Sequence, residues 1–133
     1  MSKTLIAMLA AAGLCAAQAQ AAPLTKDQYK AEQERISADY KADKQRCESL
    51  KGNAQDVCEL EAKGKEKVAK AQAEADYKNT EGARRDARKA KVEAEYAVAK
   101  ERCDDLSGER KSACVKEAQA TQAKGMADLK NAG

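Results

Sequence analysis

The sequence predicts an all-α fold made of two tandem helical hairpins, each pinned by a disulfide bond. Residues that favour long helices dominate the composition, 35% of the chain is charged and only 3% is aromatic. One stretch of sequence occurs twice, and each copy contains a pair of cysteines. Because large aliphatic side chains are too few for a compact core of ordinary size, we expect either an elongated molecule or a four-helix arrangement with coiled-coil-like packing.

The duplicated stretch runs from Tyr40 to Cys58 and again from Tyr96 to Cys114. Aligned without a gap, the two copies share the pattern Y-x3-K-x-R-C-[DE]-x-L-x-G-x5-C. The shared residues are helix formers, one glycine and two cysteines, and they do not form a catalytic constellation. The pattern therefore describes a structural unit.

Residues 1–21 have the features of a secretory signal peptide. Lys3 precedes an apolar run from Leu5 to Ala17, and small residues follow it. The run is shorter than the ~20 apolar residues that a transmembrane helix needs, and no later segment is apolar enough to span a membrane. We therefore expect export to the periplasm. The exported part then contains a first hairpin repeat over residues 22–78 and a second over residues 79–133.

Cys15 raises the alternative of a lipoprotein, because acylation signals need a cysteine at the end of the apolar run. Such signals have a small residue just before the cysteine and a large aliphatic residue three positions before it. Here Leu14 directly precedes the cysteine and Ala12 lies three positions before it. We therefore expect Cys15 to be an apolar residue of the discarded signal peptide.

The first helix of the first repeat has a clear start. Thr25, followed three residues later by Gln28, forms a capping-box pattern at a helix N-terminus. Apolar residues then recur at helical spacing on one side, at Tyr29, Ile36, Tyr40, Cys47 and Leu50. This narrow stripe is expected to face a partner helix, and the remaining sides are expected to be solvated.

Gly52 and Asn53 mark the turn of the first hairpin. Glycine adopts the left-handed conformation that ends helices, so we predict the end of the first helix near Lys51 and expect Asn53 to cap the next one. The second helix is predicted over residues 54–77. Small residues on one of its sides, such as Gly64, allow a neighbouring helix to approach closely.

The second repeat begins after a turn over residues 78–82, where Asn79 or Thr80 offers a new cap. A third helix is predicted to run to about Leu106, and a fourth over residues 109–129. The third helix repeats the apolar stripe of the first, at Val92, Tyr96, Cys103 and Leu106. The second repeat is therefore expected to form the same hairpin as the first.

Four cysteines in an exported chain of this size predict two disulfides in an oxidising compartment. The preferred pairing joins Cys47 to Cys58 and Cys103 to Cys114, each across a glycine at the hairpin turn. Closing a loop of this length stabilises a fold by ~3 kcal/mol on the chain-entropy model. The alternative treats each cysteine interval as one continuous helix and pairs Cys47 with Cys114 and Cys58 with Cys103. The glycines within the intervals argue against it.

The same cysteines allow a second class of function, a metal-binding or thiol redox protein, because four thiolates can bind zinc or copper(I). The short C-x2-C spacing of such sites is absent, and the chain has no histidine. Without histidine it also lacks the commonest general base. We therefore expect no metal, no cofactor and no enzymatic activity. Tyr40 and Tyr96 are interpreted as packing residues and not as residues that stack on a ligand.

The densest basic group comprises Arg84, Arg85, Arg88, Lys89 and Lys91. Such groups usually form a solvated helix face. Arg85, however, occupies the position of Tyr29 in the first repeat, so the group borders the packing side of its helix. Contact with an anionic envelope polymer such as lipopolysaccharide is therefore the alternative. The net charge of +3 is too small for a dedicated nucleic-acid binder.

The stretch from Tyr96 to Leu106, recurring beside one like Gly52 to Cys58, resembles an uncharacterised group of small exported proteobacterial proteins rich in Ala, Lys and Glu. The resemblance covers roughly residues 36–120, and the cysteine spacing is its most specific part. It implies a periplasmic location and supplies no activity or functional residues. The composition is also similar to that of the long helical segment of the envelope protein TolA.

We therefore expect a non-enzymatic periplasmic structural or protein-interaction protein, serving envelope maintenance or stress response through an envelope protein or polymer. A cysteine-based metal or redox protein is one alternative, and a chaperone-like periplasmic binder of unfolded proteins is another. The narrow apolar stripes also make self-association an expectation, because such a seam often completes its burial on another chain.

Overall fold

The computed structural model describes residues 22–131, so the predicted signal peptide and Cys15 lie outside the described residues. Over this range the chain forms four α-helices and one 3-10 turn, and no strand. They are α1 (Lys26–Cys47), α2 (Asn53–Lys78), α3 (Glu81–Arg102), η1 (Cys103–Asp105) and α4 (Gly108–Asn131). The predicted all-α fold class is therefore confirmed. Within residues 22–131 none of the helices combines the length and apolar content needed to cross a bilayer.

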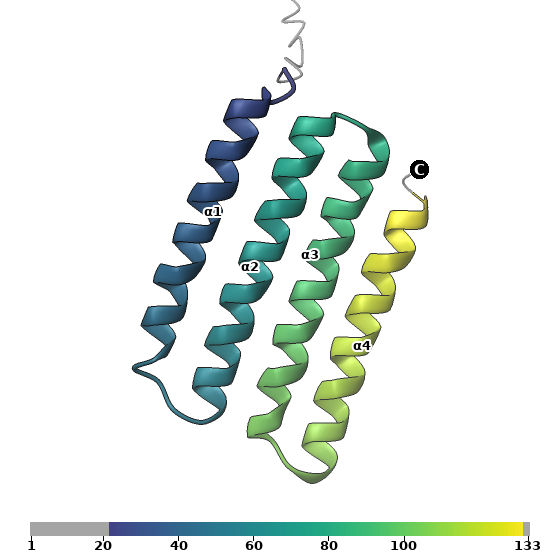
Figure 1. Ribbon diagram of the computed structural model, residues 1–133. Coiled ribbons are helices and arrows are strands. Elements are labelled where there is room, and N and C mark those ends of the chain that lie inside the picture. The colour runs from purple at the N-terminus through teal and green to yellow at the C-terminus, as the bar shows by residue number, and fades with distance from the viewer. Residues whose placement is uncertain (1–21, 132–133) are drawn as a thin grey trace, which may run out of the picture.

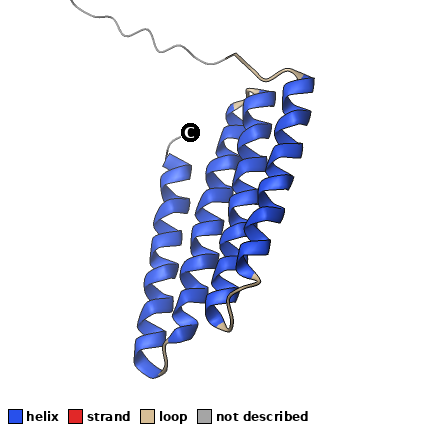
Figure 2. Ribbon diagram, turned by 90° about the vertical axis from the view of Figure 1, so that its left-hand side faces the viewer, coloured by secondary structure: helices blue, strands red, loops and turns tan. Residues whose placement is uncertain are grey.

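The four helices lie side by side in one row, in the order in which they occur along the chain (Figure 1). Extensive packing joins α1 to α2, α2 to α3 and α3 to α4. Both views show α1 and α4 at opposite edges of the row (Figure 2). The four-helix arrangement is therefore an open layer with two uncovered faces, and not a closed bundle.

The start of α1 is fixed as the sequence predicts. The Thr25 hydroxyl accepts a hydrogen bond from the backbone N–H of Gln28 at 3.2 Å, and the Gln28 side chain accepts one from the Thr25 N–H at 2.9 Å. Just before the cap, the N–H of Leu24 donates to the carbonyl of Asp76 at 3.1 Å. This bond fastens the segment before α1 to the last turns of α2.

Helices α1 and α3 both end earlier than predicted. Helix α1 ends at Cys47 and not near Lys51, and α3 ends at Arg102 and not at Leu106. In each hairpin the chain turns directly at the first cysteine, where the N–H of a leucine donates to the cysteine carbonyl at 3.0 Å. The disulfide holds the last turn of one helix beside the first turn of the next, antiparallel helix. The connecting turn must therefore start at the first cysteine.

The hairpin turns require glycine. Gly52 and Gly108 have φ angles of 58° and 57°, a conformation that side-chain-bearing residues rarely adopt. Gly52 itself occupies the N-cap position of α2, so the prediction that Asn53 caps this helix is wrong. Asn53 is instead the first residue of α2, and its side-chain Nδ2 is buried without a hydrogen-bond partner among the described residues.

The turn between α2 and α3 lies at the opposite end of the layer from the other two turns (Figure 1), beside which the disulfides lie. Asn79 takes a left-handed conformation, with φ 51°, and its N–H donates to the carbonyl of Ala75 at 2.8 Å. The Thr80 hydroxyl then caps α3 by accepting from the N–H of Ala83 at 3.2 Å. Of the two caps offered by the sequence, Thr80 is therefore the one used.

Small residues form the seams between the helices. Most fully buried side chains are alanines, at Ala62, Ala73, Ala75, Ala87, Ala90 and Ala118, and the others are Ile36, Cys47 and Cys103. A Cβ atom added at Gly64 would lie 3.0 Å from the Cβ of Ala94, and one added at Gly125 would lie 2.9 Å from a methyl group of Val92. The helix backbones therefore approach closely and bury little apolar area.

Candidate functional site

The four cysteines form two local disulfides. Cys47 pairs with Cys58 at a Cα–Cα distance of 5.5 Å, and Cys103 pairs with Cys114 at 5.7 Å. The preferred pairing is therefore confirmed, and the crossed pairing is wrong. Cys47 and Cys103 are buried at the two hairpin necks. With both pairs oxidised these cysteines present no free thiolate, and no group of metal-ligating side chains is assembled elsewhere in residues 22–131.

One face of the layer carries a groove between each pair of neighbouring helices. The α1–α2 and α2–α3 grooves share Lys65 and Ala69 in their linings. The α2–α3 and α3–α4 grooves share Glu95 and Ala99. The shared residues place all three grooves on the same side of the layer, which we call the grooved face. None of the described residues covers it.

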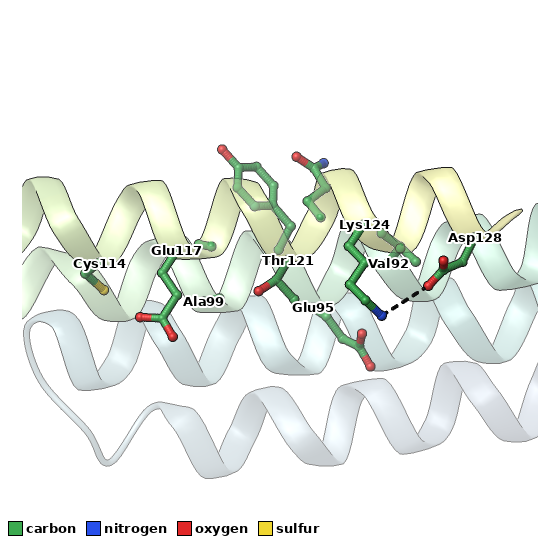
Figure 3. A pocket seen from close by; sticks show the side chains of 12 residues that line it. Val92, Glu95, Ala99, Cys114, Glu117, Thr121, Lys124 and Asp128 are labelled. Atoms are coloured by element: carbon green, nitrogen blue, oxygen red, sulfur yellow. Dashed lines mark hydrogen bonds and ion pairs between the residues drawn. The ribbon is translucent and has the colours of Figure 1, made fainter. Parts of the chain in front are cut away.

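The α3–α4 groove has a volume of about 460 Å³ (Figure 3). Val92 and Ala99 from α3 and Ala118 and Gly125 from α4 give it a floor of small apolar side chains. Polar side chains of α4, among them that of Glu117, extend from that helix across the groove toward α3 (Figure 3). The result is an open channel with an apolar floor and a polar rim.

In the first hairpin, the stretch between α1 and α2 that is equivalent to this groove has a volume of only about 140 Å³, and a further hollow of about 690 Å³ continues it toward Leu24 and Asp76. The Lys65 Nζ atom of α2 lies 3.0 Å from the Asp43 Oδ2 atom of α1, so an ion pair crosses this groove. In the gapless alignment of the two repeats, Ala99 stands at the position of Asp43 and Thr121 at that of Lys65. The second groove therefore lacks the bridge that crosses the first.

Two further aligned positions also carry a smaller residue in the second hairpin. Val92 replaces Ile36 and Gly125 replaces Ala69 on the walls of the respective grooves. All four differences remove bulk from the α3–α4 groove. These four differences widen the α3–α4 groove, although other lining positions also differ, among them Glu95, which is longer than the aligned Asp39.

The charges around the two grooves differ as well. Lys65 holds the pKa of Asp43 below its ordinary value of 3.8, chiefly through their hydrogen bond, and Arg46 adds to the effect. In the α3–α4 groove the acids Glu95, Glu117 and Asp128 face a single base, Lys124, which lies 3.4 Å from Asp128. Three carboxylates against one ammonium group leave this groove with an acidic rim.

Glu117 forms no hydrogen bond or ion pair with any of residues 22–131, and Glu95 has only Lys91 at 3.9 Å. These two carboxylates are therefore available to a partner. Acidic side chains also outnumber basic ones among all residues that line the grooved face. This excess contrasts with the chain's overall net charge of +3.

The predicted basic group on α3 is largely paired with acids of the same helix. Glu81 accepts from Arg84 Nε at 3.1 Å and from Arg88 at 2.6 Å, which lowers the Glu81 pKa, mainly through Arg88. Lys89 lies 3.7 Å from Glu93, and Lys91 is the partner of Glu95. The last member, Arg85, is exposed and has no ion pair within residues 22–131. Most of the positive charge of this group is therefore compensated locally.

The two repeated tyrosines both lie at grooves. Tyr40 lines the α1–α2 groove and Tyr96 the α3–α4 groove, and both are half-buried. The tyrosines stand out in the sequence repeat, whereas the grooves that they line were not predicted. The signal was present in the repeat alignment, in the loss of an acid at Ala99 together with the loss of a base at Thr121.

Neither a protein-family model nor a curated protein nor a solved structure matches the chain. Its function is therefore inferred from the grooved face and its charges.

Proposed function

We propose that this protein is an exported, non-enzymatic interaction protein of the cell envelope whose grooved face binds a basic amphipathic helix of a partner protein. The α3–α4 groove is the main binding site. One observation supports this most strongly: the groove is open at the two positions, Ala99 and Thr121, where the first repeat carries an ion pair that crosses its groove.

The shape of the site favours a helical partner. The groove runs between two packed helices, and side-chain rows of a third helix fit such a space by ridges-into-grooves packing. Ala99, Ala118 and Gly125 on its floor are small, so the backbone of the incoming helix can approach closely. The apolar side of an amphipathic helix would complete the burial that these residues lack in the monomer.

The charge of the rim favours a basic partner. Glu95 and Glu117 are free or weakly paired, and both lie beside the apolar floor. Lysine or arginine side chains flanking the apolar stripe of a partner helix would meet these carboxylates and set its orientation. An acidic helix would meet repulsion at the same positions.

The disulfides support a structural role for the cysteines in an oxidising compartment, which agrees with the predicted signal peptide. Each bridge fixes two antiparallel helices at one end of a groove. A metal site would need these same sulfur atoms as thiolates, and a thiol redox protein would cycle them between disulfide and thiol. The role that we assign to the two bridges is to fix the spacing of the two helices that flank each groove.

The test uses two fluorescent model helices of about 20 residues, each with an apolar stripe of Leu and Ala. One carries Lys on its polar side and the other carries Glu. We expect the oxidised protein to bind the basic helix at least about tenfold more tightly than the acidic one by fluorescence anisotropy. Equal binding of the two helices, or binding of neither, would remove the proposal.

A double variant locates the site. Ala99→Asp combined with Thr121→Lys restores to the second groove the pair that crosses the first, without changing the net charge. We expect it to weaken binding of the basic helix by about tenfold or more. The control is Gln119→Asp with Ala123→Lys on the side of α4 away from the grooved face, for which binding should stay within about twofold.

A further inference from the structure

The first hairpin carries a row of lysines on the side opposite the grooved face. Lys26, Lys30, Lys41 and Lys44 recur at helical spacing along one side of α1, about half a turn away from the groove-lining Arg35 and Asp39. Lys63 of α2 extends the row. It lies two residues from Glu61 and from Lys65, which both line the grooved face, and two residues along a helix correspond to roughly 200° of rotation, so Lys63 points to the opposite side. We call these five residues the lysine row.

The lysine row has no ion-pair partner within residues 22–131, although Glu34 and Glu48 follow Lys30 and Lys44 by one helical turn. None of its five members forms an ion pair or a side-chain hydrogen bond there, in contrast to the basic group on α3. Between Lys30 and Lys41, this side of α1 carries Gln33 and Ser37. Glu34, one turn after Lys30, forms no ion pair with it.

The second hairpin has no equivalent row. The aligned side of α3 carries Asp86, Lys89, Glu93 and Lys100, in which acids and bases alternate. Glu93 is further paired with Lys67 of α2 at 2.5 Å. The uncompensated charge is therefore a property of the first copy alone, and not a by-product of a lysine-rich composition.

An aromatic pair lies between the two helices that carry the row. The rings of Tyr29 and Tyr77 stack with centroids 4.7 Å apart and an interplanar angle of 13°. Tyr77 remains 37% exposed, and neither ring lines a groove of the grooved face. Tyrosine has an apolar ring and a polar hydroxyl, the combination that places it at the headgroup level of membranes.

We propose that the lysine row, together with Tyr77, binds the first hairpin to an anionic lipid surface. Lysine ammonium groups act as point charges toward lipid phosphates and need no exact geometry. A row along about 27 Å of helix, at 1.5 Å per residue from Lys26 to Lys44, suits an extended surface better than a single phosphate. The grooved face would then point away from the lipid and stay open to its partner.

Vesicle sedimentation of the oxidised protein tests this proposal. We expect binding to phosphatidylcholine vesicles that contain roughly 30 mol% phosphatidylglycerol and no binding to phosphatidylcholine alone. Binding should persist with about 10 mM inorganic phosphate at constant ionic strength, which separates a lipid surface from a site for free phosphate. The tyrosine fluorescence of the protein, to which four tyrosines contribute, should change on addition of the anionic vesicles. This change should be absent in a Tyr77→Ser variant.

Two charge-matched variants separate the lysine row from the basic group on α3. Lys30→Gln with Lys41→Gln should lower vesicle affinity roughly 25-fold, at about fivefold per lysine. Arg84→Gln with Arg88→Gln removes the same charge, but from residues already paired with Glu81, and should lower it less than about threefold. Equal losses in the two variants would overturn the proposal, as would binding to heparin without binding to anionic vesicles.

Discussion

In both hairpins a disulfide pins the neck beside a positive-φ glycine, whereas among the described residues an ion pair crosses the groove between the helices only in the first hairpin. The residues shared by the two copies build the frame: the cysteines, the glycine and the tyrosine on the groove wall. The residues that differ, such as Ala99 and Thr121, decide whether an ion pair crosses the groove beside the repeated tyrosine. The duplicated structural unit has thus kept its fold, while this stretch of the groove is free of a crossing ion pair in the second copy.

The two outer helices are also held differently. Helix α1 is joined to α2 by the Asp43–Lys65 pair and the stack of Tyr29 on Tyr77. Helix α4 forms no ion pair with α3 in residues 22–131, and its one ion pair to the rest of the chain, from Lys111 to Asp104, lies at the neck. Helix α4 therefore depends more than α1 on its disulfide.

Removing each disulfide in turn should give the largest effect. Cys47→Ser with Cys58→Ser and Cys103→Ser with Cys114→Ser should each lower the free energy of unfolding by ~3 kcal/mol. The second double variant should also lose hydrogen-exchange protection along the whole of α4. In the first, α1 should keep protection around Tyr29. Equal loss of protection in α1 and α4 would contradict the difference between the outer helices.

Glycine substitutions at the seams should have a smaller effect. Gly64→Ala places a Cβ atom 3.0 Å from that of Ala94, which cannot rotate away, so overpacking of ~1–3 kcal/mol should exceed the ~1 kcal/mol gain in helix propensity. Gly82→Ala is the matched control, because no atom lies within 4 Å of the added group. It should raise the thermal midpoint, while Gly64→Ala lowers it. A rise for both would show that the α2–α3 seam tolerates extra volume.

Acidification should weaken the α1–α2 and α2–α3 contacts before the α3–α4 contact. The carboxyl pKa of Asp43, lowered by Lys65, and that of Glu93, lowered by Lys67, lie below their ordinary values of 3.8 and 4.5. The unfolded chain binds these protons more readily, so the stability that the pairs contribute is present at neutral pH and is lost as the pH falls through the lowered values. The protection factors of the backbone amides, which are corrected for the intrinsic pH dependence of exchange, should therefore fall toward pH 3 at the α1–α2 and α2–α3 contacts more than at α3–α4.

The matched variants Asp43→Asn and Glu93→Gln check the origin of that effect. Each should remove the corresponding part of the acid response and leave the exchange of α4 unchanged. If a variant that combines Asp43→Asn with Glu93→Gln still lost protection to the same extent on acidification, other titratable groups would be responsible for the loss.

Much of the helical framework is predictable because the preferences of residues close together in the sequence determine it. The capping box at Thr25 and Gln28, the turn at Asn79 and the local disulfides follow from spacing and from glycine and capping preferences. The ends of α1 and α3 were not predictable, because the disulfide and not the glycine determines where each helix stops. Asn53 failed as a predicted cap because Gly52 already occupies the N-cap position.

The open row of helices and its grooves could not be predicted from the sequence alone. Alanine seams such as Ala62 and Ala118 fit many helix neighbours equally well, so the apolar pattern does not say whether four helices close into a bundle. The Asp43–Lys65 pair joins two different helices. Its absence in the second copy indicates an open groove only when it is known that α1 packs on α2 in the same way as α3 packs on α4. The basic group on α3 could be identified in the sequence, but its ion pairs with Glu81 and Glu93 reduce the positive charge that it offers to an anionic polymer.

The most direct test opens the first groove and counts binding sites. Asp43→Ala with Lys65→Thr gives the first hairpin the residues that stand at Ala99 and Thr121 in the second. Isothermal titration with the basic model helix should then change from one bound helix per chain to two. A stoichiometry that stays at one, with unaltered affinity, would contradict the claim that the Asp43–Lys65 pair keeps a partner helix out of the first groove.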